Sequence, residues 1–459
     1  DLAQGQSRPM HAVLMALVGT TPLVSHAVTF GVLVANMLLI RGLMRLIWPR
    51  IGVLATVIAA LFAVYPGYWF RPVSIALVTE SSLTMALASW LLAVYSVRWH
   101  GWRRYTAAAV SMLLIPLYVL TYELPVGVEA LRSLLFWALL PAATHRERLR
   151  RALIYWWPWG LTLLAVIVYR LVIFEPYGLY AGLNVVAELD IPAVAQLFMN
   201  VFSMQLGAVW FNPINSAAFQ DQTALLIGLV LAAAALALMM HKPVSRDAAA
   251  RSRSLAVMLL IGLCILVLGQ ATQIVSLKPP NAVGWNSRWN QVSMLGAVLI
   301  WCSVILLFGR LVLRKYAAVL YIPALVVLIA AGSAVHVRIG NYWADDWRRV
   351  RSLWWQLART APDIADNTTI LFDFPDATLL GQPDFFPFAY EGLAAADLFF
   401  NNPTLAAMHY LSQEEVGLIT RNEENLPIGY TIQHDDWALD WHLDPQRRML
   451  VRLVNGCLQ

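Results

Sequence analysis

Residues 223–241 read TALLIGLVLAAAALALMMH, and they include no Asp, Glu, Lys or Arg. An α-helix needs about 20 consecutive apolar residues to cross the hydrocarbon core of a bilayer, and this stretch is close to that length. A transmembrane β-strand would alternate apolar and polar positions, which this run of leucines and alanines does not do. Because a helix pairs its backbone groups internally, the stretch predicts a transmembrane helix.

Nine further apolar runs of comparable length occur along the chain. They cover residues 21–40, 51–66, 78–97, 105–121, 124–141, 152–174, 254–277, 292–309 and 316–334. Apolar residues make up 59% of the 459 residues and charged residues only 13%, which leaves too little polar surface to coat a soluble protein of this size. We therefore expect an all-α polytopic transmembrane bundle of about ten helices, with the lipid bilayer as partner and no nucleic-acid partner.

Lysines and arginines are concentrated in every second connection between these predicted helices. Five connections hold seventeen of them: Arg41, Arg45, Arg50, Arg98, Arg103, Arg104, Arg146, Arg148, Arg150, Arg151, Lys242, Arg246, Arg251, Arg253, Arg310, Arg314 and Lys315. The opposite connections before residue 335 hold only Arg8, Arg71, Lys278 and Arg288. The positive-inside rule then places the five basic connections in the cytoplasm and both chain ends outside.

This orientation also constrains residues 193–212, which are long enough to span. Because the next predicted helix must begin outside to bring the basic residues after it inside, we expect this segment to lie on or dip into the outer face. The polar side chains of Gln196, Asn200 and Gln205 favour that interpretation. The chain begins with DLAQGQSRPM and has no initiating Met, so we expect an N-terminally truncated protein whose first transmembrane helix lies upstream.

From about residue 335 the apolar runs become short, and nine cations stand against seventeen anions. We expect two domains, a transmembrane domain at 1–334 and a small extracytoplasmic α/β domain at 335–459. Helical spacing places Trp347, Leu353, Trp354 and Leu357 on one stripe. The segments expected to form strands are 368–374, 429–434 and 448–454, and a second helix is expected near 393–410.

Carboxylates are sorted between the connections as well. Ten acidic residues precede residue 335, and only Glu147 and Asp247 fall on the predicted cytoplasmic side. Topology does not require this, so the pattern favours a site on the outer face, although solvated outer loops also explain it. Glu129 and Arg132 lie one helical turn apart within a predicted span, where they form either part of this site or an internal salt bridge that fixes helix packing.

Two predicted outer segments combine cations with aromatic rings. They are YPGYWFRPVSIALVTES, residues 65–81, with Arg71 and Glu80, and KPPNAVGWNSRWNQ, residues 278–291, with Lys278, Trp285 and Arg288. A guanidinium group binds phosphate at two points, and a flat ring covers the apolar face of a sugar. The competing interpretation is an interfacial belt of aromatic residues in contact with lipid headgroups. Arg170, near the outer end of its predicted helix, is expected to snorkel toward the interface.

The order of these parts resembles the GT-C superfamily of polytopic glycosyltransferases, which includes the protein O-mannosyltransferases and the aminoarabinose transferases. The similar elements are GQSRPM at 5–10, YP followed by RPVSIALVTESS at 65–82, LTYELPV at 120–126, SRWNQ at 287–291, and the predicted outer tail. The resemblance implies a bacterial integral protein of the inner or plasma membrane. It also implies transfer of a sugar from a polyprenyl-phosphate donor to an acceptor on the extracytoplasmic face.

The resemblance further suggests roles for individual residues. Asp1, Glu80 and Glu123 are candidates for the catalytic carboxylate, acting directly or through a divalent metal such as Mg²⁺ or Mn²⁺. The candidates for binding the phosphate and the sugar are Arg8, Arg71, Lys278, Arg288 and Trp285. The acidic pair that marks the superfamily would lie at or upstream of Asp1. The alternatives are a transporter or flippase of a lipid-linked saccharide and a non-catalytic scaffold of the cell envelope.

Overall fold

The computed structural model is described at these residues: 8–18, 21–73, 76–141, 144–174, 190–211, 217–241, 252–276, 281–283, 285–313, 316–366, 368–373, 400, 406–410, 432–434, 437–439, 448–454 and 457–458. The chain divides into two compact units, Asp1–Gly340 and Asn341–Gln459. The division falls six residues after the boundary expected from the sequence. Each unit is considered by itself.

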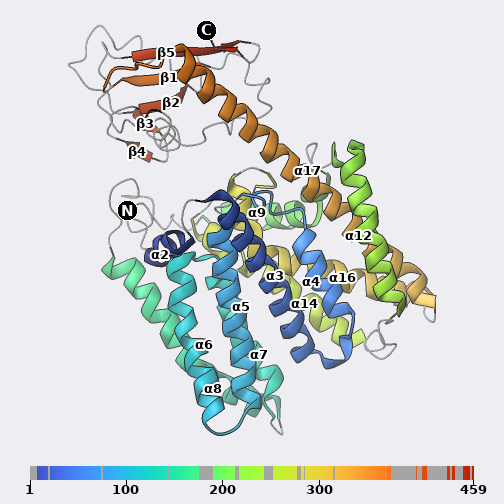
Figure 1. Ribbon diagram of the computed structural model, residues 1–459. Helices are drawn as coiled ribbons and strands as arrows, with labels where there is room; N and C mark the ends of the chain where they lie inside the picture. The colour runs from blue at the N-terminus through green and yellow to red at the C-terminus, as the bar shows by residue number, and fades with distance from the viewer. Residues whose placement is uncertain are drawn as a thin grey trace. The chain divides into compact units, whose positions relative to one another are not determined.

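The described residues of the first unit form helices (Figure 1). The longer ones are α2 (Pro9–Val18), α3 (Pro22–Ile47), α4 (Leu54–Val64), α5 (Ala76–Arg98), α6 (Trp102–Thr121), α7 (Leu131–Leu139), α8 (His145–Val168), α9 (Ile191–Ser203), α12 (Gln222–His241), α14 (Ser252–Leu268), α16 (Gln291–Leu313) and α17 (Ala317–Thr360), the last of which continues past Gly340. Short segments join them: η1 (Pro49–Ile51), η2 (Leu124–Ala130), η3 (Tyr169–Ile173), η5 (Met204–Ala208), α10 (Val209–Phe211), η6 (Ala217–Gln220), α15 (Ala271–Val275) and η7 (Trp285–Asn290).

Eight helices among the described residues are long and apolar enough to cross a membrane. Seven of them correspond to expected spans, and the eighth is Ile191–Phe211. The expected spans 51–66, 124–141 and 254–277 differ, because their longest helices have 11, 9 and 17 residues. Helix-breaking positions explain two of these differences: Pro125 lies in the first turn of η2, and Gly269–Gln270 separate α14 from α15. The chain is a multi-pass membrane protein.

The basic ends of α3 and α5 lie together at one end of the bundle, as the alternation expected from the sequence requires. We call the end where α6 stops and α16 starts the Glu123 end, and the opposite end the basic end. At the basic end, Arg98 at the close of α5 donates to the backbone O of Leu46 near the close of α3, at 2.6 Å. That the Glu123 end faces outward stays a prediction.

Residues 191–211 satisfy the length criterion for a span, but their contacts favour a position at the Glu123 end. Gln205 Nε2 donates to Ser293 Oγ at 2.9 Å, and Ser293 lies in the first turn of α16. Tyr65, which follows the last residue of α4, donates through its hydroxyl to the backbone O of Gln205. The interpretation of this segment as an outer-face element therefore remains our prediction.

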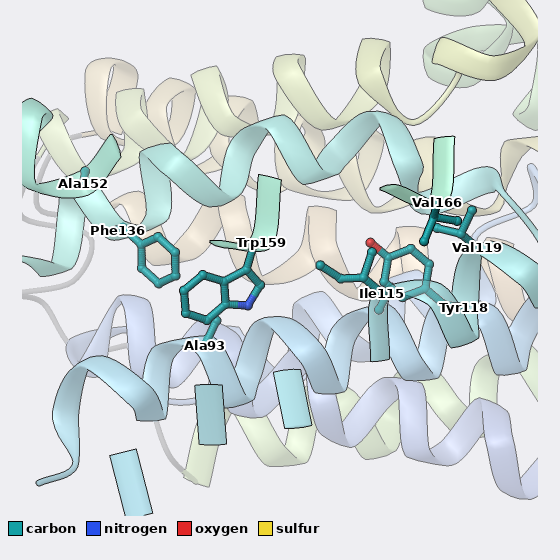
Figure 2. Packing of buried hydrophobic residues seen from close by; sticks show 9 residues of the cluster. Ala93, Ile115, Tyr118, Val119, Phe136, Ala152, Trp159 and Val166 are labelled. Atoms are coloured by element: carbon teal, nitrogen blue, oxygen red, sulfur yellow. The ribbon is translucent and has the colours of Figure 1, made fainter. Parts of the chain in front are cut away.

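Close packing within the first unit depends on small residues and on aromatic rings. A Cβ atom at Gly296 of α16 would lie 2.5 Å from the backbone O of Gly262 on α14, so only glycine allows these helices to approach so closely. Between α5, α6, α7 and α8, Phe136 and Trp159 lie side by side, with ring centroids 5.1 Å apart (Figure 2). Interhelical packing of this kind holds a bundle together in lipid, where burial from water does not drive association.

The second unit contains a short parallel sheet. β1 (Thr369–Asp373) lies between β2 (Ala406–Tyr410) and β5 (Arg448–Val454) and runs parallel to both. β6 (Cys457–Leu458) pairs antiparallel with β5, and β3 (Ile432–His434) pairs antiparallel with β4 (Trp437–Leu439). The segments expected to form strands are confirmed where they are described, but the helix expected near 393–410 is wrong at 406–410, which form β2. Residues 391–399 and 401–405 lie outside the described residues, so the extracytoplasmic α/β domain as a whole stays a prediction.

The part of α17 beyond Gly340 carries the stripe expected from the sequence. Leu353, Trp354 and Leu357 are buried, as their helical spacing predicts. Trp347, at the beginning of the same stripe, is 60% exposed. It lies almost two turns before the buried residues, and helical spacing alone does not show where the covering surface ends.

Candidate functional site

Glu123 lies at the Glu123 end, in the connection between α6 and η2, and its carboxylate is held by Arg8. Arg8 Nη2 donates to Glu123 Oε1 at 2.6 Å, and Arg8 Nε donates to Oε2 at 3.0 Å. This two-point pairing is the arrangement in which guanidinium binds carboxylate or phosphate most strongly. The fold thus brings together two candidate residues that are 115 positions apart in the sequence.

Arg170 joins the same carboxylate from a third part of the chain. It lies in η3, a π-helical segment that continues α8, and its Nη1 is 3.0 Å from Glu123 Oε2. Arg170 therefore reaches the expected end of the bundle, but it pairs there with a protein carboxylate, which the snorkelling interpretation does not include. The sequence reasoning did not place Arg170 in the candidate site, and its position near the predicted outer end of a helix was the available signal.

Tyr122 connects this ion pair to Arg288 of η7. Arg288 Nε donates to the hydroxyl oxygen of Tyr122 at 3.0 Å, and its guanidinium carbon lies 5.4 Å from the ring centroid of Trp289. On the other side, the guanidinium carbon of Arg8 lies 4.3 Å from the ring centroid of Tyr122. Tyr122 is buried, so it holds two candidate arginines at fixed positions around one ring.

These five residues, Arg8, Tyr122, Glu123, Arg170 and Arg288, are called the arginine cluster below. Guanidinium groups stay protonated in proteins. Burial opposes the ionisation of Glu123, but the charges and hydrogen bonds of Arg170 and Arg8 outweigh it and lower the pKa of this carboxyl well below its usual range. The cluster therefore combines three guanidinium groups with one ionised carboxylate.

A second network holds the candidates Arg71 and Glu80. Glu80 is fully buried, and its Oε1 accepts from Arg71 Nε at 3.1 Å while its Oε2 accepts from Asn36 Nδ2 at 2.7 Å. Arg71 Nη1 also donates to the backbone O atoms of Phe62 and Ala63, in the last turn of α4. A cation at the carboxyl end of a helix satisfies carbonyls that have no partner within the helix.

The two networks are neighbours. Ser82, one half-turn beyond Glu80 on α5, donates to the backbone O of Tyr122 at 2.7 Å. Phe70 N donates to Ser287 Oγ at 3.1 Å, which joins the residue before Arg71 to the residue before Arg288. The predicted outer segments 65–81, 120–126 and 278–291 therefore meet at one end of the bundle wherever they are described.

Glu129 and Arg132 form a third pair, deeper between α5, α6 and η2. All five N–H groups of Arg132 are used: two bind the carboxylate of Glu129, each at 2.7 Å, and the others reach Ser89 and Ser111. Trp90 Nε1 donates to Glu129 Oε1 at 2.8 Å, and both charged side chains are at most 2% exposed. This saturation favours the internal salt bridge over the functional interpretation.

Buried carboxamides surround the start of α16 and were not singled out as a group from the sequence. Gln205 Nε2 and Gln270 Nε2 both donate to Ser293 Oγ, at 2.9 and 3.0 Å, and among the described residues the Oε1 atoms of both glutamines have no hydrogen-bond partner. Gln205 lies in the π-helical segment η5, and Gln270 lies at the break between α14 and α15. Interrupted helices with exposed polar groups are the elements from which transporters build ion sites.

Three of the candidate residues have no described side chain. Asp1 and Lys278 lie outside the described residues, and Trp285 begins η7 without a described side chain. Within the described ranges, no group of three or more His, Cys, Asp or Glu side chains could hold a metal ion. The suggested Mg²⁺ or Mn²⁺ therefore has no ligand set in this part of the chain and stays a prediction that depends on the undescribed residues.

No protein-family model, no curated protein and no solved structure matches this chain. The family resemblance therefore remains an expectation from the sequence, and the functional argument depends on the geometry of the arginine cluster.

Proposed function

We propose that the protein is a membrane glycosyltransferase that takes a sugar from a polyprenyl-phosphate donor at the Glu123 end of the bundle, on the extracytoplasmic face. One observation carries the proposal: three guanidinium groups from three separate parts of the chain gather at Tyr122 and Glu123, two of them paired with the Glu123 carboxylate and the third with the Tyr122 hydroxyl. Placing several cations together at the mouth of an apolar bundle is unfavourable unless an anion compensates them. The phosphate of a lipid whose chain stays in the bilayer is such an anion.

The cluster suits the departure of a lipid phosphate. When the acceptor hydroxyl attacks the anomeric carbon, the bond between this carbon and the phosphate oxygen breaks, and the lipid phosphate leaves with additional negative charge. Fixed cations stabilise charge that develops in the transition state. Tyr122 keeps Arg8 and Arg288 in place before the reaction, so little reorganisation is needed when the charge appears.

The residue that takes the proton from the acceptor stays a prediction. Glu80 is buried with both of its oxygens paired, and Glu123 is paired with two arginines, which lower its basicity. Asp1, or an acidic residue upstream of it, therefore remains the better candidate for the general base. The divalent metal also stays a prediction, because its ligands would have to include undescribed residues.

The buried carboxamides support a transporter or flippase as the second candidate. Gln205 and Gln270 meet at Ser293 where two helices are interrupted, as in transporters that bind substrate at broken helices. A flippase would move the lipid-linked sugar between leaflets without breaking the bond between sugar and phosphate.

One experiment separates the two functions. The purified full-length protein in liposomes is given a polyprenyl-phosphate sugar labelled in the sugar, together with candidate acceptors, and two readings are taken: release of the lipid phosphate, and movement of intact lipid between leaflets. Release by the wild type, lost in Arg288→Ala and kept in Arg151→Ala at the basic end, supports the transferase. Movement without release supports the flippase and contradicts the transferase, and normal release by Arg288→Ala removes the arginine cluster from the site.

A further inference from the structure

Glu123 occupies the place in the arginine cluster where an anionic ligand would be expected to bind. Its Oε1 accepts from Arg8, and its Oε2 lies within 3.0 Å of both Arg8 Nε and Arg170 Nη1. A carboxylate and a phosphate present the same pair of oxygens to a guanidinium fork. A phosphate that reaches Arg8 and Arg170 must therefore share these donors with Glu123 or displace it.

We propose that Glu123 is a resident counter-anion: it competes with the phosphate of the lipid-linked substrate for Arg8 and Arg170, and so sets how tightly that phosphate is held and how readily it leaves. This inference rests on the proposed function and gives Glu123 a role other than proton transfer.

Exposure distinguishes this pair from the other two buried ion pairs. The side chains of Arg8, Glu123 and Arg170 are 14%, 21% and 12% exposed, so a ligand can approach them from the surface. The Arg71–Glu80 and Arg132–Glu129 pairs are at most 6% exposed. Exchange of a protein carboxylate for a ligand phosphate requires such access, and only the Glu123 pair offers it among these three.

The charges of the competing anions give the competition its direction. The phosphodiester that joins the lipid to its sugar carries one negative charge, like the Glu123 carboxylate, whereas the phosphomonoester that leaves carries nearly two at neutral pH. The leaving phosphate therefore competes with Glu123 for Arg8 and Arg170 more strongly than the intact sugar donor does, which is the condition for catalysis by differential binding. Without Glu123 as a competitor, the product would be held too strongly for efficient turnover.

The cluster is expected to survive the loss of Glu123. Arg8 also stacks on the Tyr122 ring, and Arg288 is held by the Tyr122 hydroxyl, so two of the three cations keep an anchor that does not involve the carboxylate. Substitution of Glu123 therefore frees the N–H groups of preorganised arginines. Affinity for a phosphate should then rise while the stability of the protein falls, because the remaining like charges repel one another.

Glu123→Gln tests this inference with farnesyl phosphate, a short polyprenyl monophosphate, as the probe. The expected result is binding at least about 10-fold tighter than in the wild type, a smaller KM for the polyprenyl-phosphate sugar and a smaller kcat, because release of the lipid phosphate becomes slow. Thermal stability without the probe should fall. The matched control is Glu147→Gln, which removes the same charge from an exposed pair with Arg151 at the basic end and should change none of these quantities.

The outcomes are distinguishable. If the wild type binds farnesyl phosphate and Glu123→Gln binds it equally or more weakly, the counter-anion role is overturned while the proposed function stands. If neither binds it and the wild type does not release lipid phosphate from the sugar donor, both fail. Should Glu123→Gln not be recovered folded, Glu123→Ala, which leaves space for a phosphate oxygen, gives the same test with the same expected increase in affinity.

Discussion

Two ion pairs of the same chemistry, Arg132–Glu129 and Arg8–Glu123, lie in very different surroundings. Arg132 has one carboxylate partner and uses its remaining N–H groups on Ser89 and Ser111, so every charge and every polar hydrogen is satisfied inside the bundle. Glu123 has two ion-paired cations, is partly exposed, and has a third cation one tyrosine away. The first pair is sealed inside the bundle, whereas the second is reached from the surface and shares one carboxylate between two cations.

The comparison teaches that an ionisable residue in a membrane bundle is not by itself evidence of a site. A fully buried pair with every hydrogen bond made fixes helix packing, whereas several cations gathered near the surface indicate a site that can bind an anion. The Arg71–Glu80 pair lies between the two cases: it is buried like the first, but Arg71 Nη2 has no hydrogen-bond partner in the described part of the chain. We interpret it as a support for the turn between α4 and α5.

Breaking the Arg132–Glu129 pair should have the largest effect on stability. Arg132→Ala leaves the Glu129 carboxylate and the serine oxygens buried without their donors, which is expected to cost about 3–5 kcal/mol of the free energy of unfolding. Denaturation of the purified protein in detergent measures this. Arg151→Ala is the control, because that pair is exposed and should contribute about 0–1 kcal/mol. Equal losses of stability in the two variants would contradict the structural role of the buried Arg132–Glu129 pair.

Removing a cation from the arginine cluster should lower activity and leave the fold intact. Arg288→Ala is expected to lower the rate of lipid-phosphate release by about 100-fold or more, the cost typical of losing one group that stabilises developing negative charge. Its denaturation midpoint should stay close to that of the wild type, because Arg288 is only partly buried. The opposite result, lower stability with unchanged turnover, would show that Arg288 fixes packing as Arg132 does.

The sequence was sufficient to predict the membrane bundle because apolar runs and the sorting of cations are properties of composition along the chain. It also gathered Arg8, Glu123 and Arg288 on one predicted face, and these residues do meet. It did not indicate that Glu123 would be paired twice or that Arg170 would join it, because a partner more than 40 positions away is decided by helix packing. For the same reason it did not decide whether Glu129 and Arg132 form part of a site or an internal salt bridge, since nothing in the sequence shows that Ser89 and Ser111 bind Arg132.

The boundaries of the helices were harder to predict than the existence of most of the spans. Hydropathy continues across Pro125 and Gly269, whereas the helices there change to η2 or break before α15. These interruptions matter for the site, since one positions Glu123 and the other Gln270. A pattern of apolar residues indicates which segments lie in lipid, but it does not indicate where the backbone hydrogen bonds of a helix are interrupted.

Substitutions of Tyr122 test the arginine cluster through a smaller expected effect. Tyr122→Phe keeps the ring under Arg8 and removes the hydroxyl that accepts from Arg288, so binding of farnesyl phosphate is expected to weaken about 5-fold, the equivalent of one hydrogen bond of about 1 kcal/mol. Tyr122→Leu removes both anchors and should weaken binding further. Titration of the two variants with farnesyl phosphate measures the difference, and identical affinities for Phe and Leu would show that the ring does not position Arg8.

The smallest expected effect concerns pH and helix α2, which follows Arg8. Burial, together with the charge of Arg8, lowers the pKa of His11 to about 4 from its ordinary value of 6.5. A histidine whose pKa is lower in the packed state favours packing while it is neutral, so the docking of α2 is at full strength above about pH 6.5 and weakens as pH falls toward 4. Because α2 is attached to Arg8, this weakening should contribute a small part of the decline in affinity for farnesyl phosphate between pH 7 and pH 5, most of which comes from protonation of the phosphate itself, whose second pKa is about 6. In His11→Gln that part of the decline should disappear. If the pH profile of this variant equals that of the wild type, the packing of α2 is not coupled to the arginine cluster.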